Sequence, residues 1–204
     1  MGYWIILPIV GYLIGSIPFG FIAGRVISGV DVRDHGSGMT GMTNVARTMG
    51  YRIGIPVLLL DLSKGIITIV LVKIFTPTAM PGVASISALA VIVGHIWPVF
   101  AGFRGGRGIA PGLGGLVALE PITGLIAGMT GAITIAISRY VSLGSILGTL
   151  AGSVVLIILY LNGNIPTEYI WYVIIGAPLV IIKHRDNIGR LISGNERKIG
   201  KRSE

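Results

Sequence analysis

The sequence has no cysteine and few charged residues: Asp, Glu, Lys and Arg make up only 12% of its 204 residues. The absence of cysteine excludes disulfide bonds, thiolate nucleophiles and cysteine-ligated metals. About a quarter of the residues in a soluble globular domain are charged, so this shortage argues against a soluble fold. Because 52% of the residues are hydrophobic, the sequence is instead typical of an integral membrane protein.

Most of the hydrophobic residues fall in long apolar runs. A helix needs about 20 residues to cross the hydrocarbon core of a bilayer. Six runs approach or exceed this length: 3–24, 53–75, 83–102, 122–138, 143–161 and 168–183. A seventh run, 109–120, is short and rich in glycine, so by itself it fits either a short span or a re-entrant segment.

Basic residues indicate which loops face the cytoplasm, because Lys and Arg gather on that side of membrane proteins. They occur in four regions, which are 25–52, 103–108, Arg139 and the tail from 183. The loops 76–82 and 162–167 carry no charge. We therefore expect the four basic regions to be cytoplasmic and the two uncharged loops to be external.

Two of the basic regions constrain the short run. If 103–108 and Arg139 lie on one side, then 109–120 and 122–138 must form two crossings between them. We therefore predict an all-α integral membrane protein with seven transmembrane helices, its N-terminus outside and its C-terminus in the cytoplasm. Residues 1–204 form one polytopic domain in this prediction, with a basic tail over about 184–204. Five or six spans with a re-entrant segment is the alternative.

Two charged residues lie inside the second apolar run. Asp61 and Lys64 are three residues apart and therefore share a helix face. Charges within a membrane are costly and are usually paired or functional. We favour an ion pair near the cytoplasmic end of the span, with Lys64 extending toward water, over a direct role in substrate binding.

The loop 31–47 combines three glycines with Ser37, two threonines, Asn44 and two arginines. Backbone N–H groups in glycine-rich turns bind anions, and the guanidinium groups of Arg33 and Arg47 suit phosphate oxygens. No Gly-Lys-Ser/Thr sequence follows the glycines, so this is not a Walker loop. Taken alone, these residues fit an anion site and a flexible connector equally well.

A second glycine-rich segment, 104–108, reads Arg-Gly-Gly-Arg-Gly. Glycines on both sides of Arg107 let a phosphate meet backbone N–H groups and a guanidinium together. A helix that starts after this segment adds the positive end of its dipole. RNA-binding segments of similar composition occur in disordered, polar contexts, so we expect no nucleic-acid partner. Anchoring of the chain by cytoplasmic arginines is the alternative to a phosphate site.

The last apolar run ends in a third polar segment, 183–191. His184 and Asn187 share a face if the helix continues. Ser142, at the cytoplasmic end of another run, either contacts a substrate or caps its helix. We find neither a Ser-His-Asp spacing nor a metal-ligand cluster in the sequence. An enzyme built on these segments is therefore expected to act by positioning anionic substrates, without a cofactor or a metal.

Three runs in this order resemble the sequence motifs of the bacterial acyl-phosphate:glycerol-3-phosphate acyltransferases of the PlsY type. They are DVRDHGSGMTGMTNVARTMG, GHIWPVFAGFRGGRGIAPGLG and HRDNIGRLISGNERK. The likeness extends from Gly15 to Glu196. It implies seven transmembrane helices and the transfer of an acyl group from acyl phosphate to the 1-hydroxyl of glycerol 3-phosphate. The products are then lysophosphatidic acid, for phospholipid synthesis, and phosphate.

The resemblance also implies a cellular setting and roles for individual residues. It implies a multi-pass cell-membrane protein that works as a monomer among membrane lipids, with its active site facing the cytoplasm. Ser37, Arg47, His184 and Asn187 are implied to be catalytic, and Glu196 to be structural, while a substrate phosphate accepts the proton. The implied substrate-binding residues are Gly36, Gly38, Asn44, Arg104, Gly105, Gly106, Arg107, Gly108 and Ser142.

The sequence departs from the usual motifs at Met39, Met42, Arg107 and Pro111. Arg107 keeps the charge of the usual lysine but presents a planar fork. Pro111 lacks both the hydroxyl of the usual threonine and a backbone N–H. These departures leave open the alternative that the protein is a paralogue without turnover. A small transporter or flippase of an anionic metabolite is the other alternative, although it requires polar residues through the depth of the spans, where they are few.

Overall fold

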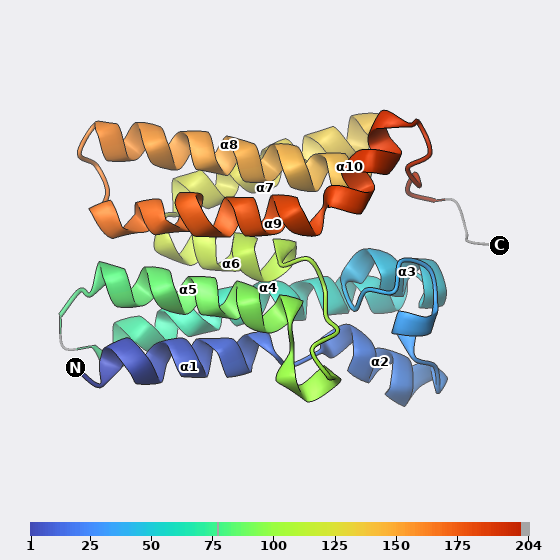
Figure 1. Cartoon of the computed structure of the whole chain (residues 1–204), viewed down its shortest axis with the longest axis horizontal. Helices are drawn as coiled ribbons and strands as arrows, with labels where there is room; N and C mark the ends of the chain where they lie inside the picture. Colours follow the sequence, from blue (N-terminus) through green and yellow to red (C-terminus); the bar gives the residue numbers. More distant parts are fainter. Residues whose placement is uncertain (77, 201–204) are drawn as a thin grey trace.

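The structure, a computed structural model, describes residues 1–76 and 78–200. Over these residues the regular elements are all helical, and the long helices run side by side along one axis (Figure 1). The helices are α1 (Tyr3–Gly15), α2 (Phe19–Ser28), α3 (Met42–Met49), α4 (Tyr51–Phe75), α5 (Pro81–Ile96), α6 (Ile109–Leu119), α7 (Pro121–Ser138), α8 (Val141–Leu161), α9 (Ala177–Lys183) and α10 (Arg185–Ile192). The shorter turns are η1 (Val32–Asp34), η2 (Val99–Ala101), η3 (Thr167–Tyr169) and η4 (Tyr172–Gly176), of which η4 is π-helical. The end of the predicted basic tail, 201–204, lies outside the described residues.

Five helical stretches are long and apolar enough to cross a membrane. They are Tyr3–Ser28, Tyr51–Phe75, Pro81–Ala101, Pro121–Ser138 and Val141–Leu161. At 1.5 Å per residue α6 is only about 16 Å long, which is short of the roughly 30 Å hydrocarbon core. The predicted last span, 168–183, is divided among η3, η4 and α9. The all-α fold is confirmed for the described residues, and the number seven stays a prediction.

The first apolar run forms two helices instead of one. α1 ends at Gly15, and α2 begins at Phe19 after the segment Ser16-Ile17-Pro18. Pro18 has no N–H, and its ring disfavours a helical conformation at the residue before it. The prediction of one helix over 3–24 was wrong at this break. The break leaves the carbonyl of Gly15 free to accept a hydrogen bond from Lys64 Nζ at 3.3 Å.

Glycine lets α6 pack against α4 with their backbones in contact. A Cβ added to Gly65 of α4 would collide with the backbone of Pro111 and Gly115, and one added to Gly114 of α6 would collide with the carbonyl of Leu62. Small residues at such contacts are typical of membrane helices, because lipid supplies no hydrophobic force between them. This contact fixes the position of the first turn of α6, which borders the site described below.

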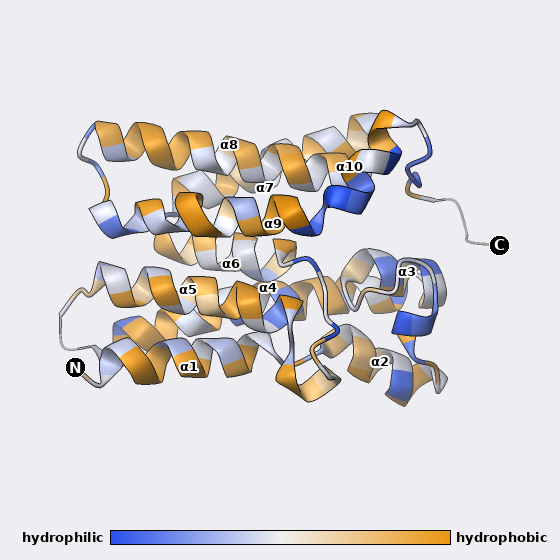
Figure 2. Ribbon diagram, in the orientation of Figure 1, coloured by the Kyte–Doolittle hydropathy of each residue, from blue (hydrophilic) through white to orange (hydrophobic). Residues whose placement is uncertain are grey.

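Polar and apolar residues separate along the long axis of the molecule. Figure 2 shows apolar residues along the long helices and polar residues gathered at the end with α3, α10 and the C-terminus. The N-terminus and the connection from α8 to η3 lie at the opposite end (Figure 1). Large apolar side chains on the long helices are exposed, including Ile5, Leu59, Leu125 and Val154, as expected of a surface that contacts lipid. The three predicted polar segments therefore share one end of the bundle.

Candidate active site

A cavity of about 310 Å³, here called the polar cavity because charged and polar residues are among those that line it, lies at this end. All three predicted segments contribute to its lining. The predicted site residues that line it are Ser37, Asn44, Arg47, Gly106, Arg107, Ser142, His184 and Asn187. Glu196 also lines it. Gly36, Gly38, Arg104 and Gly105 are not among the lining residues, and Gly108 lines a neighbouring groove. The structure thus brings together segments that are more than 50 residues apart, as the sequence predicts.

Asn44 holds the loop 31–47 in shape from the first turn of α3. Its side-chain Oδ1 accepts a hydrogen bond from the Ser37 N–H at 2.8 Å. Its Nδ2 donates to the carbonyls of Val32 at 2.7 Å, Met39 at 2.9 Å and His35 at 3.1 Å. The residue is only 1% exposed, so its amide satisfies four backbone groups that burial would otherwise leave unpaired. A direct contact between Asn44 and a substrate stays a prediction.

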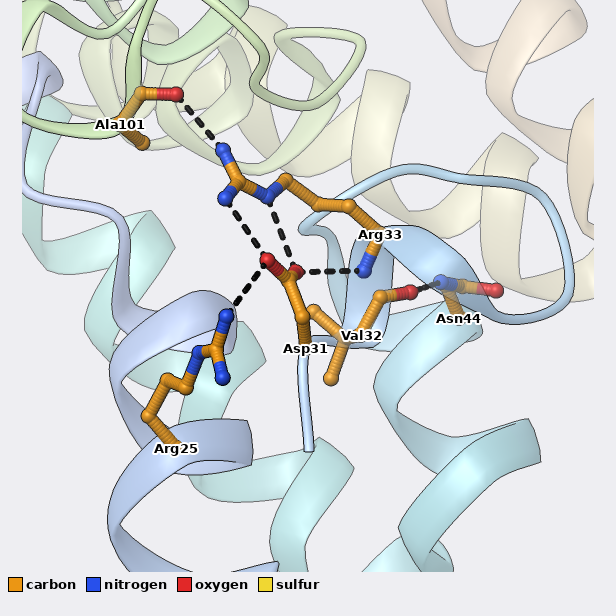
Figure 3. A network of polar contacts seen from close by, with 6 residues as sticks. All are labelled: Arg25, Asp31, Val32, Arg33, Asn44 and Ala101. Carbon is orange, nitrogen blue, oxygen red and sulfur yellow. Dashed lines mark hydrogen bonds and ion pairs between the residues drawn. The ribbon is translucent and has the colours of Figure 1, made fainter. Parts of the chain in front are cut away.

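The same loop is anchored to the rest of the protein through Asp31 and Arg33. Figure 3 shows Arg33 between Asp31 and the carbonyl of Ala101, with Arg25 on the far side of the Asp31 carboxylate. Arg33 Nη2 and Nε bind the two carboxylate oxygens at 2.8 and 2.9 Å, and its Nη1 donates to Ala101 at 2.7 Å. These hydrogen bonds hold the pKa of Asp31 far below its usual value. Arg33 is not among the residues that line the cavity, so the hypothesis that it binds phosphate is not supported.

Arg107 and Arg47 give the cavity a positive charge. Burial is the largest influence on each, and it lowers the pKa of both guanidinium groups, with further lowering by neighbouring arginines. Neither is deprotonated, because arginine stays charged in proteins. Arg47 donates one hydrogen bond to the carbonyl of Arg197 at 3.2 Å. The cavity therefore contains concentrated cationic donors that a bound anion would stabilise.

The first turn of α6 adds backbone donors beside Arg107. Gly108 precedes the helix with φ of 84°, and Ile109 and Ala110 line the cavity. Pro111 falls in the first turn, where a backbone N–H has no partner within the helix. Its presence therefore removes one potential anion donor but disrupts no helical hydrogen bond.

Glu196 connects two helices, α8 and α10, at the cavity. Its carboxylate accepts hydrogen bonds from Asn187 Nδ2 at 2.7 Å, from Ser142 Oγ at 2.8 Å and from Arg190 Nε at 2.7 Å. Burial alone raises the pKa of Glu196, but these hydrogen bonds outweigh it, so that the pKa lies below its usual value. Asn187 and Ser142 were predicted to face the substrates, and Glu196 fixes the orientation of both. The Oδ1 atom of Asn187 is buried and has no hydrogen-bond partner among the residues that the structure describes.

His184 begins the third segment and is 2% exposed. Its Nδ1 lies 2.8 Å from the carbonyl oxygen of Val180. A carbonyl can only accept, so Nδ1 carries the proton and the neutral ring keeps Nε2 as an acceptor. Burial is the main cause that lowers the pKa of His184, and the positive charge of Arg107 lowers it further. The imidazole is therefore neutral near pH 7.

Asp61 and His95 line the cavity and belong to a buried cluster that the sequence reveals only in part. The predicted ion pair is confirmed, with Lys64 Nζ 2.6 Å from Asp61 Oδ1. The expectation that Lys64 extends to water was wrong, because it is 2% exposed. His95, from the last turn of α5, places its Nδ1 3.6 Å from Asp61 Oδ1. The one signal for His95 in the sequence is its position within the second motif.

An apolar groove of about 270 Å³ adjoins the polar cavity. It runs between α6, α7, α8 and the η4–α9 segment. Small residues on its walls make room for a ligand, including Gly112, Gly128, Gly131, Gly144 and Gly148. Leu58, Ile109, Ile135 and Ser145 line both spaces. The site can therefore hold an anionic group in one compartment and a chain of methylene groups in the other, a feature that the sequence did not reveal.

Comparison with known proteins gives matches along nearly the whole chain. Residues 5–194 match the family model described as glycerol-3-phosphate acyltransferase. A glycerol-3-phosphate acyltransferase of Desulforamulus reducens is 46% identical over 200 residues, covering 97% of this chain and 96% of the relative. Glycerol-3-phosphate acyltransferase 3 of Dehalococcoides mccartyi is 42% identical over 209 residues, covering 98% of this chain and 97% of the relative.

Two solved structures share the fold. The chain is similar to PlsY, an integral membrane glycerol 3-phosphate acyltransferase, in its glycerol 3-phosphate form, with a TM-score of 0.86 and 37% identity. That match covers 97% of this chain and 96% of the solved one. The lysophosphatidic acid form of PlsY matches with a TM-score of 0.82 and 35% identity, covering 97% and 95%.

Proposed function

This chain belongs to the glycerol-3-phosphate acyltransferase family and is an integral membrane enzyme of phospholipid synthesis, and we propose that its acyl donor is an acyl phosphate. The observation that carries this proposal is the junction of an arginine-lined polar cavity with an apolar groove. An acyl phosphate has both chemistries in one small molecule. The second substrate, glycerol 3-phosphate, is entirely polar and suits the cavity alone.

The two phosphates are expected to occupy different parts of the cavity. The donor phosphate lies against Gly106, Arg107 and the first turn of α6, with its acyl chain in the groove. The acceptor phosphate lies nearer Ser37 and Arg47. The unpaired Asn187 Oδ1 and the neutral His184 Nε2 are acceptors, so they suit the hydroxyl groups of glycerol. Arg107 binds the donor phosphate with a planar fork in place of the usual lysine.

The reaction joins the 1-hydroxyl oxygen of the acceptor to the acyl carbonyl carbon. The bond between that carbon and the phosphate oxygen breaks, and inorganic phosphate leaves. The hydroxyl proton passes to a substrate phosphate oxygen, so that no side chain has to serve as the base. Ser37, Arg47, His184 and Asn187 contribute by holding the reacting atoms in attack geometry, which is worth several kcal/mol when two reactants are fixed together.

The membrane arrangement is proposed to follow the distribution of charge. The helix ends that lie away from the basic loops are on the external side of the cell membrane, and the polar cavity faces the cytoplasm, where the basic loops lie. We propose that α6 and the η4–α9 segment also cross the membrane, packed against neighbouring helices, which brings the number of crossings to seven. We expect the enzyme to work as a monomer.

A direct test compares two acyl donors with the purified protein in detergent. With palmitoyl phosphate and glycerol 3-phosphate we expect lysophosphatidic acid and phosphate, and with palmitoyl-CoA we expect neither. Product from palmitoyl-CoA alone would overturn the proposed donor. Tight binding of glycerol 3-phosphate without any turnover would instead indicate a paralogue that has lost its activity.

A matched pair of variants tests the proposed roles. His184→Ala removes a buried cavity residue, and we expect a loss of about 100-fold or more in turnover. The neighbouring Arg185→Ala changes a side chain that is 80% exposed, so turnover is expected to stay within about twofold. Equal effects of the two substitutions would argue against the proposed site.

A further inference from the structure

Asp61, Lys64 and His95 form a buried cluster beneath the glycine-rich segment 104–108. Asp61 and Lys64 belong to α4, His95 belongs to the last turn of α5, and all three are at most 6% exposed. Lys64 Nζ lies 2.6 Å from Asp61 Oδ1 and 3.5 Å from His95 Nδ1. It also donates to the Gly15 carbonyl and lies 4.8 Å from the centre of the Phe19 ring. Burying charges at this depth costs free energy, so we expect a cluster of this kind to have a function.

His95 contacts the backbone of the glycine-rich segment through both its own carbonyl and its imidazole. The Gly106 N–H donates to the His95 carbonyl at 3.0 Å. A Cβ added to Gly106 would collide with His95 Nε2, and a Cβ added to Gly105 would collide with the His95 carbonyl. The ring edge that carries Nε2 therefore lies directly against Gly106. The opposite edge, which carries Nδ1, faces Asp61 and Lys64.

These contacts form a chain from buried charges to the donor-binding segment. The ion pair lies against one edge of the ring, the other edge packs against Gly106, and the next residue is Arg107 in the cavity. No side-chain hydrogen bond within the described residues holds Arg104 or Arg107, so the conformation of this segment depends on its support. Because a displacement of about 1 Å can cost about 100-fold in rate, a rigid support has a functional consequence.

We propose that Asp61, Lys64 and His95 are positioning residues that set the geometry of the segment 104–108 for the phosphate of the acyl donor. The proposal rests on the proposed function only for the identity of that donor. It predicts that disturbing the cluster weakens use of the donor much more than use of glycerol 3-phosphate. A cluster that merely stabilised the fold would affect the two substrates alike.

Steady-state kinetics of His95→Ala, Lys64→Met and the neutral double variant Asp61→Asn/Lys64→Met test this split. For each we expect kcat/KM for palmitoyl phosphate to fall about 10- to 100-fold, with the KM for glycerol 3-phosphate within about threefold. The double variant matters because it leaves no unpaired buried charge and can fold where Lys64→Met does not. Lys73→Met is the matched control, since Lys73 lies on the same helix, outside the cluster, and donates a hydrogen bond to the Ala118 carbonyl.

A second readout does not depend on activity. Hydrogen–deuterium exchange of the peptide that contains 104–108 is expected to rise at least about tenfold in His95→Ala and in the double variant, and to stay unchanged in Lys73→Met. Unchanged exchange with a uniform loss of stability would overturn the positioning role. If the unmodified protein fails to use palmitoyl phosphate while the exchange results hold, the proposed donor fails and the support of the segment stands.

Discussion

Two glycine-rich segments line the same cavity, but they are held in opposite ways. The loop 31–47 is held from within, because Asn44 bonds four of its backbone groups and Arg33 binds Asp31. The segment 104–108 is held from outside, because its backbone rests on His95. Similar composition therefore does not mean similar flexibility. The partner of each loop decides whether its glycines form a defined binding surface.

The largest effect is expected where the internal support of loop 31–47 is removed. Asn44→Ala leaves the Ser37 N–H and three carbonyls without their partner, so Ser37 moves from its place in the cavity. We expect turnover to fall by about 100-fold or more, measured by phosphate release. Thr48→Ala is the control, since the Thr48 hydroxyl bonds only to the Asn44 carbonyl within α3. Wild-type turnover in Asn44→Ala would show that the loop is shaped by something else.

The external support of segment 104–108 is tested by steric crowding. Gly106→Ala forces a methyl group against the His95 ring, and we expect about 10- to 100-fold lower kcat/KM for the acyl donor. Gly189→Ala, in α10, adds a methyl group that meets no atom within 4 Å among the described residues, and Gly189 does not line the cavity. Its activity is expected to stay within about twofold. Similar losses in both variants would show that contact with the His95 ring is not the cause.

The sequence predicted that the three segments lie together, but it predicted less well which contacts each residue makes there. Arg47, Arg107, Ser142, His184 and Asn187 all line the cavity, because basic, polar segments between apolar spans had to share one face. Arg33 was predicted to bind phosphate, although its guanidinium binds Asp31 and the Ala101 carbonyl and does not line the cavity. Asn44 lines the cavity and also holds four backbone groups, so its contact with a substrate stays a prediction. Local sequence does not reveal which partner a side chain finds. For the same reason only the structure shows the contacts of His95 with Asp61 and Gly106, the break at Pro18 and the apolar groove.

Arg33 and Arg25 both bind the carboxylate of Asp31, and we predict that they contribute unequally to the stability of the protein. Arg33→Met leaves the nearly buried Asp31 without its main partner, and we expect a loss of about 1–3 kcal/mol in stability. Arg25→Met removes a longer contact of 3.3 Å from a side chain that is 54% exposed, worth about 0–1 kcal/mol. Thermal unfolding in detergent measures both. A larger loss from Arg25→Met would contradict the arrangement in Figure 3.

The smallest expected effect concerns the pH dependence of Glu196. Its folded-state pKa lies below its usual value, so between the two pKa values the unfolded protein binds more protons than the folded protein. The stabilisation is therefore complete above the unfolded pKa of about 4.3 and is lost as the pH falls through the folded pKa. Glu196→Gln is expected to lower the unfolding temperature at pH 7 and to differ little from the parent in strong acid. A difference that grows on acidification would have the wrong sign.

The central claim is that one cavity holds two phosphates while the adjoining groove holds an acyl chain. Its most direct test is a paired measurement of lysophosphatidic acid and phosphate, with palmitoyl phosphate as donor, in the presence and absence of glycerol 3-phosphate. Equal amounts of the two products, both dependent on glycerol 3-phosphate, are predicted. Release of phosphate without lysophosphatidic acid, or at the same rate without the acceptor, would contradict the account.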